Sequence, residues 1–516
     1  MNTVPSSPPS AGRKEWLALS VLILAVMLLA IDGTVLFLAV PALTVELMPT
    51  ASQILWIGDI YSFVIAGLLV TMGNLADRIG RKRLLLIGSV AFGAASLVAA
   101  FAPSAEMLII ARALLGVAGA TIMPSTLSII RNLFLNPAQR TKAVAIWSAG
   151  ATAGAALGPL VGGVLLEHFW WGSVFLINVP VIALIIIFGT WLLPESKNPQ
   201  SARIDPASAV LSVLAIVPVV YAIKHAIGQG FDWTVIAGIL LGTLSGWVFA
   251  RRQQRLEVPL VDIDLFRIPA FSGAVASTGL AIFAFFGVLF FLSQYLQLVR
   301  GYSPFWAGLA EMPATIASIA VIAIVGFILA KLGLGRAIAA GLLIGAIGLA
   351  GLGVTEGWTS FLGMGISLAI IGLGIGIAMT LATDAVVSVA PPARAGAAAS
   401  IAETAYELGV ALGIGVLGSI QTAVYRANLQ IPAGTSASDA NSLMDSLASA
   451  AATLGGKNAE LLAVAQSAFT HGVQVTAYIA AALLVVAAFV AWWLIPSTVP
   501  AGTHSTTESE EIRAGH

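Results

Sequence analysis

Cysteine is absent from this chain of 516 residues, and charged side chains are scarce, at 9% of the total. Without cysteine, the chain has no disulfide, no thiol chemistry and no cysteine-ligated metal. Soluble globular domains carry about 25% charged residues, so 9% charged against 59% hydrophobic residues excludes an ordinary soluble protein. The 24 basic and 24 acidic residues cancel, and net charge therefore gives no reason to expect nucleic acid as a partner.

Long apolar segments occupy most of the chain instead. A membrane-spanning helix needs about 20 mostly apolar residues, and fourteen segments meet this requirement. The expected spans are 16–40, 53–75, 83–102, 105–129, 143–166, 171–193, 206–226, 234–250, 271–299, 304–330, 337–356, 358–390, 398–423 and 471–495. The first is longer than the apolar core of a cleaved signal peptide, so we expect it to be retained. The sequence thus predicts an all-α polytopic membrane protein with 14 transmembrane helices.

The distribution of positive charge predicts the orientation in the membrane. With the N-terminus inside, 19 of the 24 Lys and Arg residues fall in connections on the inner side, and four, including Lys224, fall on the outer side. Because short cytoplasmic loops are enriched in Lys and Arg, we expect both termini in the cytoplasm. The expected location is the plasma (inner) membrane, with membrane lipid around a chain that we expect to be a monomer.

A basic segment after the second span has a partial repeat in the second half of the chain. Gly326, Lys331, Gly333 and Arg336 repeat the spacing of Gly73, Arg78, Gly80 and Arg83, shifted by 253 residues. Parallel repeats predict two six-helix bundles related by an axis along the membrane normal, with two extra helices between them. The expected divisions are an N-terminal tail (1–15), an N-terminal bundle (16–193), a linker with the extra helices (194–267), a C-terminal bundle (268–495) and a cytoplasmic tail (496–516).

The connection 424–470 is the long one. Leu443, Leu447 and Ala450 lie at helical spacing, and a second apolar group at 461–465 follows a Gly-Gly pair. This pattern predicts two short amphipathic helices that form an external hairpin; a poorly ordered loop is the alternative. The tail beyond Pro496 ends in an acidic cluster at 508–511 and is expected to be disordered.

Few charges lie inside the expected spans. They are Asp32, Asp59, Arg112, Glu311, Asp384, Glu403 and Glu407. A charged side chain in hydrocarbon is costly enough to indicate a functional site by default. Six acids against one base favour protons and cationic cargo over anionic cargo.

Arg112 and Asp32 form the first candidate site. Arg112 cannot lose its charge, so it needs an acidic partner, and Asp32 is the obvious one. Neutralising Asp32 would then free Arg112 to bind elsewhere, which is a plausible proton-coupled switch. The alternative is that Asp32 is a structural acid.

Asp59 lies near the outer end of its span with Trp56 and Tyr61 close in sequence. A carboxylate beside an aromatic ring can bind a cation that also lies over the ring face. The alternative is an acid at the interface, wetted by the outer leaflet.

Glu403 and Glu407 are four residues apart and therefore share one helical face. Two carboxylates this close in a low-dielectric site cannot both ionise easily, so at least one is expected to hold a proton near neutral pH until a cation binds. Tyr406, between them, supplies an aromatic ring. A structural pair near the cytoplasmic mouth is the alternative. Glu311 precedes Pro313, which frees a backbone carbonyl that can line a cavity; site and structural interpretations of Glu311 both stay open.

Small residues mark close helix contacts in the fifth span. Gly154, Gly158 and Gly162 recur every four residues, Gly163 follows, and Pro159 kinks the same helix. Such a stripe lets another backbone approach tightly, and a seam of this kind can seal one side of a central pathway.

These motifs resemble those of a known family. The segment 73–83, in which Gly73, Asp77, Arg78, Gly80 and Arg81 stand, resembles the cytoplasmic loop signature of the major facilitator superfamily. Segments 112–116 and 154–163 resemble its proton-linked and antiporter motifs. Segment 31–41 is similar to the first-helix signature of the fourteen-helix drug:proton antiporters, and segments 56–62, 171–180 and 403–409 are similar to the exporters of quaternary ammonium antiseptics, dyes and methyl viologen.

The resemblance implies the major facilitator fold and a proton-coupled multidrug efflux antiporter. It casts Asp32 with Arg112 in proton coupling, and Asp59, Glu403 and Glu407 in proton or cation binding. Some relatives for divalent cations carry an acid five residues after the proline, where Ser318 stands here, so the preference between monovalent and divalent cargo stays open. The gradient of protons is the expected energy source, without a cofactor or a metal.

Two other functions remain as alternatives. Transport of a neutral or anionic metabolite or lipid would call for more Arg or Lys in the spans than Arg112 alone. A receptor or scaffold that transports nothing would not need acids inside the bilayer. An enzyme is not expected, because no cluster of His, Ser or metal ligands converges within the spans.

Overall fold

The computed structural model describes residues 10–197, 205–256, 259, 261–390, 395–455 and 457–497. Most of the two predicted tails lies outside these ranges, with the acidic cluster at 508–511. Arg203, Arg394 and Arg513, which entered the charge count, also lie outside them.

Helices long and apolar enough to cross a membrane number 14 in the described part of the chain, which confirms the predicted count. They are α1 (Arg13–Leu47), α2 (Ala51–Ile79), α3 (Arg81–Ala100), α4 (Ala105–Leu133), α5 (Pro137–His168), α6 with α7 (Ser173–Leu176, Asn178–Leu192), α8 (Pro206–Gln229), α9 (Trp233–Gln253), α10 (Pro269–Leu298), α11 (Pro304–Ala320), α13 (Leu334–Thr355), α14 (Phe361–Val389), α15 with α16 (Ala395–Leu412, Gly418–Asn428) and α19 (Ala459–Leu494).

Shorter elements join them: η1 (Ile263–Arg267), η2 (Val321–Ala323), α12 (Val325–Leu332), the π-helical η4 (Gly413–Leu417), α17 (Ala437–Asp445) and α18 (Leu447–Leu454). No strand occurs within the ranges described.

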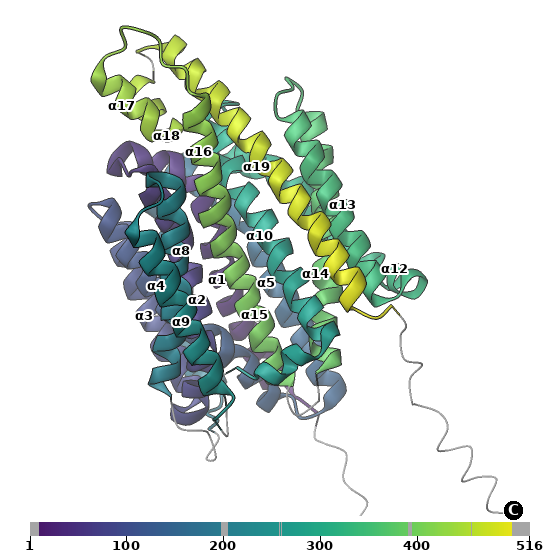
Figure 1. Cartoon of the computed structure of the whole chain (residues 1–516). Helices are drawn as coiled ribbons and strands as arrows, with labels where there is room; N and C mark the ends of the chain where they lie inside the picture. The colour runs from purple at the N-terminus through teal and green to yellow at the C-terminus, as the bar shows by residue number, and fades with distance from the viewer. Residues whose placement is uncertain are drawn as a thin grey trace, which may run out of the picture.

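The helices form two halves. One large cluster of buried apolar side chains lies in the N-terminal half, and the other lies mainly in the C-terminal half but includes Phe37 of α1 and Leu55 of α2. Helices α1 to α7 make the N-terminal half, and α10 to α19 make the C-terminal half. The extra pair lies against the N-terminal half, because α8 packs on α2 and α9 packs on α8. In Figure 1, α17 and α18 stand at the upper left, and we call this end of the molecule the hairpin side; α12 lies at the right.

The basic segment differs from the predicted loop. Helix α2 continues through Ile79, so Gly73, Asp77 and Arg78 lie in its last two turns. Only Gly80 interrupts the helices, with a φ of +116° that a residue without Cβ adopts readily. Gly333 has a φ of +72° between α12 and α13, so the repeat seen in the sequence recurs as one sharp turn in each half.

The hairpin region also differs in detail from the expectation. Helix α19 begins at Ala459, capped by the side chain of Asn458 on Leu461 N–H at 3.2 Å, so the second expected short helix is the start of the last span. The first expected helix is divided at Ser446 into α17 and α18, because Ser446 caps α18. The tenth span is likewise interrupted, by η2 between α11 and α12.

Candidate functional site

Asp32 and Arg112 form a buried ion pair between α1 and α4. Arg112 Nη1 lies 3.0 Å from Asp32 Oδ2, and the two side chains are 1% and 0% exposed. Arg112 Nε donates to the carbonyl of Ile57 at 3.2 Å, and the guanidinium lies 4.6 Å from the ring centroid of Tyr61. The structure therefore brings together the two residues that the sequence suggests as partners.

Asn178 completes this site from α7. Its Nδ2 donates to Asp32 Oδ1 at 2.7 Å and to the hydroxyl of Ser96 at 3.1 Å. Both oxygens of the Asp32 carboxylate are thus hydrogen-bonded, which a buried carboxylate requires. Sequence reasoning gave Asn178 no role of its own; the signal was a lone amide in an otherwise apolar segment.

Asp59 lies in a second buried ion pair that the sequence did not predict. Its Oδ2 is 2.5 Å from Lys224 Nζ, and the side chains of Asp59 and Lys224 are 0% and 5% exposed. The same Nζ lies 3.7 Å from the ring centroid of Trp56. Sequence reasoning placed Lys224 at a helix end and gave it no partner; α8 continues to Gln229, and Lys224 packs from it against Asp59 of α2.

The C-terminal half closes over this pair through η4. A Cβ on Gly415 would lie 3.0 Å from Asp59 Oδ2 and 3.0 Å from Lys224 Cε. A residue with a Cβ here would require the side chains of Asp59 and Lys224 to shift by a few tenths of an ångström. Single π-helical turns occur often at functional sites, and this one brings backbone of one half against a charged pair of the other.

Glu311 lies in a small cavity between the two halves. The cavity has a volume of about 120 Å³ and is lined from α1, α5, α10, α11 and α14, with Pro159, Phe286 and Ser318 among the lining residues. Glu311 is 3% exposed. Ser318 shares the cavity with Glu311.

Glu403, Tyr406 and Glu407 are half-buried on α15, which packs against α2 and α10. The charge of Arg112 acts on Glu407, whose side chain faces Ser62 of α2. Tyr406 packs edge-on against Phe286 at a centroid distance of 6.0 Å. This helix therefore faces the Asp32–Arg112 site and, through Phe286, the Glu311 cavity.

Glu195 holds the turn at Gly80. Its carboxylate accepts the backbone N–H groups of Lys82 at 3.2 Å and Arg83 at 3.1 Å, the first turn of α3. Arg81 pairs with Asp77 at 2.8 Å. Sequence reasoning missed Glu195, which supplies a carboxylate to the positive end of a helix dipole.

Glycines of α5 make close contacts on two sides. A Cβ on Gly154 would lie 2.6 Å from the carbonyl oxygen of Met27 in α1, and one on Gly163 would lie 2.8 Å from Phe305 Cα in α11. From the other side, a Cβ on Gly308 would lie 2.4 Å from the carbonyl oxygen of Pro159. Gly158 and Gly162 face Thr34 and Val35 of α1. Helix α5 is thus joined to its own half and, on the hairpin side, to the other half.

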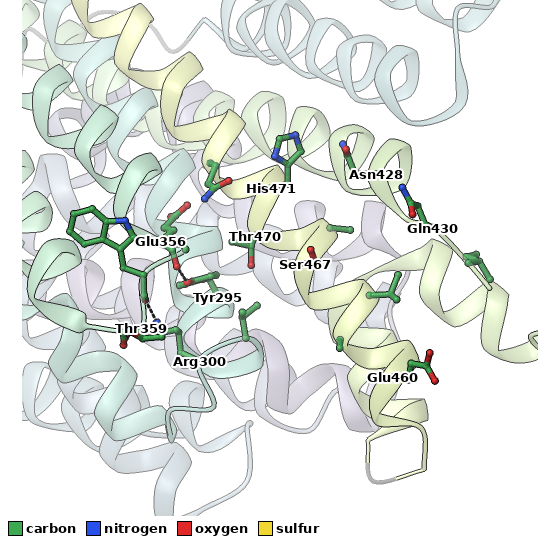
Figure 2. Close-up of a pocket in the computed structure, with 18 of the residues that line it drawn as sticks. Tyr295, Arg300, Glu356, Thr359, Asn428, Gln430, Glu460, Ser467, Thr470 and His471 are labelled. Carbon is green, nitrogen blue, oxygen red and sulfur yellow. Dashed lines mark hydrogen bonds between the residues drawn. The ribbon is translucent and has the colours of Figure 1, made fainter.

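A larger cavity of about 1340 Å³ opens on the hairpin side. Figure 2 shows Ser467, Thr470 and His471 along α19, with Tyr295 and Glu356 to one side of them. The Tyr295 hydroxyl donates to the backbone carbonyl of Glu356. Glu356 is 1% exposed, and burial raises its pKa well above the ordinary value of 4.5.

Comparison with known families identifies the protein family of this chain. The family model described as the Major Facilitator Superfamily matches residues 22–414. This chain belongs to the major facilitator superfamily. The resemblance seen in the sequence is thereby confirmed.

Relatives within the superfamily include the multidrug efflux pump LfrA of Mycolicibacterium smegmatis, which is 43% identical over 501 residues. The alignment covers 95% of this chain and 99% of LfrA. The methyl viologen resistance protein SmvA of Salmonella typhimurium is 37% identical over 427 residues, covering 83% of this chain and 86% of the relative. A crystal structure of a bacterial homologue of the human lysosomal transporter Spinster, described as inward-facing and unoccupied, aligns with a TM-score of 0.67 over 95% of this chain and all of that one. Its 18% identity supports the major facilitator fold alone.

Proposed function

We propose that this major facilitator protein exports lipophilic organic cations in exchange for protons by alternating access. The cargo class comprises quaternary ammonium antiseptics, dyes such as ethidium, and methyl viologen. The observation that carries the proposal is the Asp59 site, where a buried carboxylate and the Trp56 ring already surround an ammonium group, at 2.5 Å and 3.7 Å. The names of LfrA, a multidrug efflux pump, and SmvA, a methyl viologen resistance protein, support the same cargo class.

Asp32 and Arg112 are the proposed proton-coupling pair. A proton on Asp32 would cancel its charge and weaken its hold on Arg112, whose charge also acts on Glu407 and Asp59. An arginine that interacts with acids of both halves can pass a change at one of them to the others. Coulomb interactions in such a poorly solvated site are stronger than in water.

Glu311, Glu403, Glu407 and Tyr406 are proposed to line the path of the cation between the halves. The Glu311 cavity of about 120 Å³ is smaller than the roughly 300–1,000 Å³ of sites for drug-sized ligands. The cation would therefore enter only when the halves separate, as alternating access requires.

The two sides of the pathway have different proposed gates. The contacts of Gly163 with Phe305 and of Gly308 with Pro159 fit a pathway closed on the hairpin side. The segment with Gly73, Asp77, Arg78, Gly80 and Arg81 would act at the opposite gate. We place that side and both termini in the cytoplasm, following the distribution of Lys and Arg.

Exchange of one proton for one monovalent cation would move no net charge. The pH gradient would then drive it at about 1.4 kcal/mol per unit. With two protons per cation, the membrane potential would add about 2.3 kcal/mol per 100 mV. The several buried acids leave room for either stoichiometry.

The decisive experiment uses purified protein in liposomes that contain a pH-sensitive dye. A gradient of ethidium is imposed on wild type, Asp32→Asn, Glu407→Gln and the control Asp439→Asn, which alters an acid of α17 away from the proposed path. We expect proton movement that depends on the cation in wild type and in the control, and its loss in the other two variants. Proton movement that is independent of every cation tested would favour the alternative that the protein transports a neutral or anionic metabolite or a lipid. No transport at all would favour a receptor or scaffold.

A further inference from the structure

Lys224 comes from the extra helix pair and reaches into the site of the proposed cation. Its Nζ lies between the Asp59 carboxylate, at 2.5 Å, and the Trp56 ring, at 3.7 Å, and it is 5.9 Å from the ring centroid of Phe63. A carboxylate with an aromatic face is the environment that binds ammonium ligands. Lys224 therefore has the contacts expected of a bound cation.

The site does not suit a lysine fully. A lysine ammonium carries three N–H donors, and the described residues offer Nζ no partner in good hydrogen-bond geometry beyond its close contact with Asp59. A quaternary ammonium or phosphonium ion has no N–H donor, so it would lose nothing in the same place. Such a ligand would also add apolar contact with the rings of Trp56 and Phe63.

The charge balance of the site requires that an incoming cation replace the Lys224 ammonium rather than bind beside it. Asp59 is 0% exposed, and removing one partner of a buried ion pair leaves an uncompensated buried charge, which is strongly destabilising. The charged groups that act on Asp59 are Lys224 of α8 and, more weakly, Arg112 of α4. One monovalent cation can replace the Lys224 ammonium without leaving Asp59 unpaired.

The position of Lys224 in α8 allows it to leave. Pro218 lies inside α8, six residues before Lys224, and a proline in a helix interior removes a hydrogen bond and kinks the helix. The start of α8 is anchored, because Asp205 accepts two hydrogen bonds from Arg252 of α9, each 2.9 Å. These bonds lower the pKa of Asp205 to about 2. Beyond Pro218, His225 Nε2 lies 2.9 Å from Oδ2 of Asp232, the N-cap of α9, so this part of α8 would shift together with the start of α9 while the base of α8 is held.

The C-terminal half controls access to the pair. Gly415 of η4 lies so close to Asp59 and Lys224 that an added Cβ would be 3.0 Å from an atom of each, so separation of the halves in this region would uncover the ion pair. The site is therefore bounded by three bodies: the N-terminal half, the C-terminal half and the extra pair.

We propose that Lys224 is an internal competitor for the cation site: it occupies the Asp59–Trp56 site in this conformation, and a monovalent lipophilic cation binds there by displacing it. The extra helix pair thereby helps to set which cations bind, because a cargo must outcompete the lysine. This inference rests on the proposed export of cations. It adds that α8 helps to select the cargo and does not merely connect the two halves.

Binding of tetraphenylphosphonium, a monovalent cation without N–H donors, tests the proposal by titration calorimetry on the purified full-length protein. A ligand that must displace an occupant has an apparent Kd equal to its intrinsic Kd divided by the fraction of unoccupied sites, so the apparent Kd is raised. We expect Lys224→Met to bind about tenfold more tightly than wild type. Asp59→Asn should weaken binding, and Lys224→Met should bring no gain in the Asp59→Asn background.

Lys142→Met is the matched control, because Lys142 lies over the ring of Trp16, at 5.7 Å, outside the site. It should leave the Kd unchanged. If wild type binds the cation and Lys224→Met binds it no more tightly, the proposal is wrong. If wild type does not bind the cation at all, the proposed function fails first, so the two failures can be told apart.

A second measurement uses wild type only, in case Lys224→Met does not fold. An amine-reactive acetylating reagent is applied with and without tetraphenylphosphonium, and labelled peptides are quantified by mass spectrometry. Displacement predicts at least a severalfold rise in labelling of Lys224 with the cation and no change at Lys142. Unchanged labelling of Lys224 at saturating cation would overturn displacement.

Discussion

Asp445 of α17 accepts a hydrogen bond from the backbone N–H of Ala51, the first residue of α2, at 3.1 Å. The bond joins the hairpin of the C-terminal half to a helix of the N-terminal half. Because the first N–H groups of a helix lack partners within it and carry partial positive charge, a carboxylate is well suited to this place. In the proposed closure of the pathway on the hairpin side, this contact would help to hold the two halves together.

Asp445→Ala should loosen that closure. Loss of a carboxylate at a helix N-terminus costs about 0.5–2 kcal/mol, which corresponds to a change of about 2- to 30-fold in an opening equilibrium. The absence of cysteine allows a single reporter, Gln421→Cys, a buried position in the small cavity that Asp445 also lines. Maleimide labelling of this reporter should become faster by that factor. Asp439→Ala on the same helix is the control, and equal rates in all three proteins would contradict the role given to Asp445.

Asp32→Asn should destabilise the protein through Arg112. Removing one partner of a buried ion pair costs about 3–5 kcal/mol, because Arg112 keeps its charge at 1% exposure. The double variant Asp32→Asn/Arg112→Gln should recover most of the loss. Thermal unfolding in detergent measures both effects, and additive losses in the double variant would show that the two residues are not coupled.

Glu356→Gln should change the dependence of stability on pH. Burial raises the pKa of Glu356 well above 4.5, so the folded state binds more protons than the unfolded state between 4.5 and the raised value. Stability therefore falls as pH rises through that window and is lowest above it. The variant should be more stable than wild type at pH 8 and should lose part of this slope. Melting temperatures at pH 4.5, 6 and 8 test it, with Glu460→Gln as a control at the rim of the same cavity; parallel curves for wild type and Glu356→Gln would refute it.

Gly154→Ala should disrupt the packing of α5 on α1. The new Cβ would lie 2.6 Å from the carbonyl oxygen of Met27 and 2.9 Å from its Cα, and backbone atoms cannot rotate away as a side chain can. Overpacking typically costs about 1–3 kcal/mol. Gly326→Ala, where nothing lies within 4 Å of the new atom, is the control. Equal melting temperatures for both variants would show that the contact between α5 and α1 can accommodate a methyl group at position 154.

Local patterns account for what the sequence predicted well. The length of the apolar segments predicted 14 helices, and the single arginine within a span left Asp32 as its natural partner. The repeat of glycines and basic residues predicted matching turns, and the structure has them at Gly80 and Gly333. Each of these inferences uses residues that lie in one segment, or charges that have few possible partners.

What the sequence did not predict depends on how segments meet in space. Lys224 looked like the end of a helix because its partner Asp59 is far away in sequence, and only the packing of α8 on α2 joins them. The π-helical turn at η4 has no period in the sequence that distinguishes it from the α-helix around it. Glu195 likewise follows α7 in the chain but acts on α3.

The attachment of the extra pair has an evolutionary consequence. The described residues of the pair lie outside the two large clusters of buried side chains, although Val220 of α8 joins a small cluster with Phe63 of α2 and Ala411 of α15. If Lys224 competes with cargo, a lineage could broaden or narrow its drug resistance by mutating α8 alone. Selection for tolerance to a new biocide would then change residues around Lys224 and Pro218 of α8.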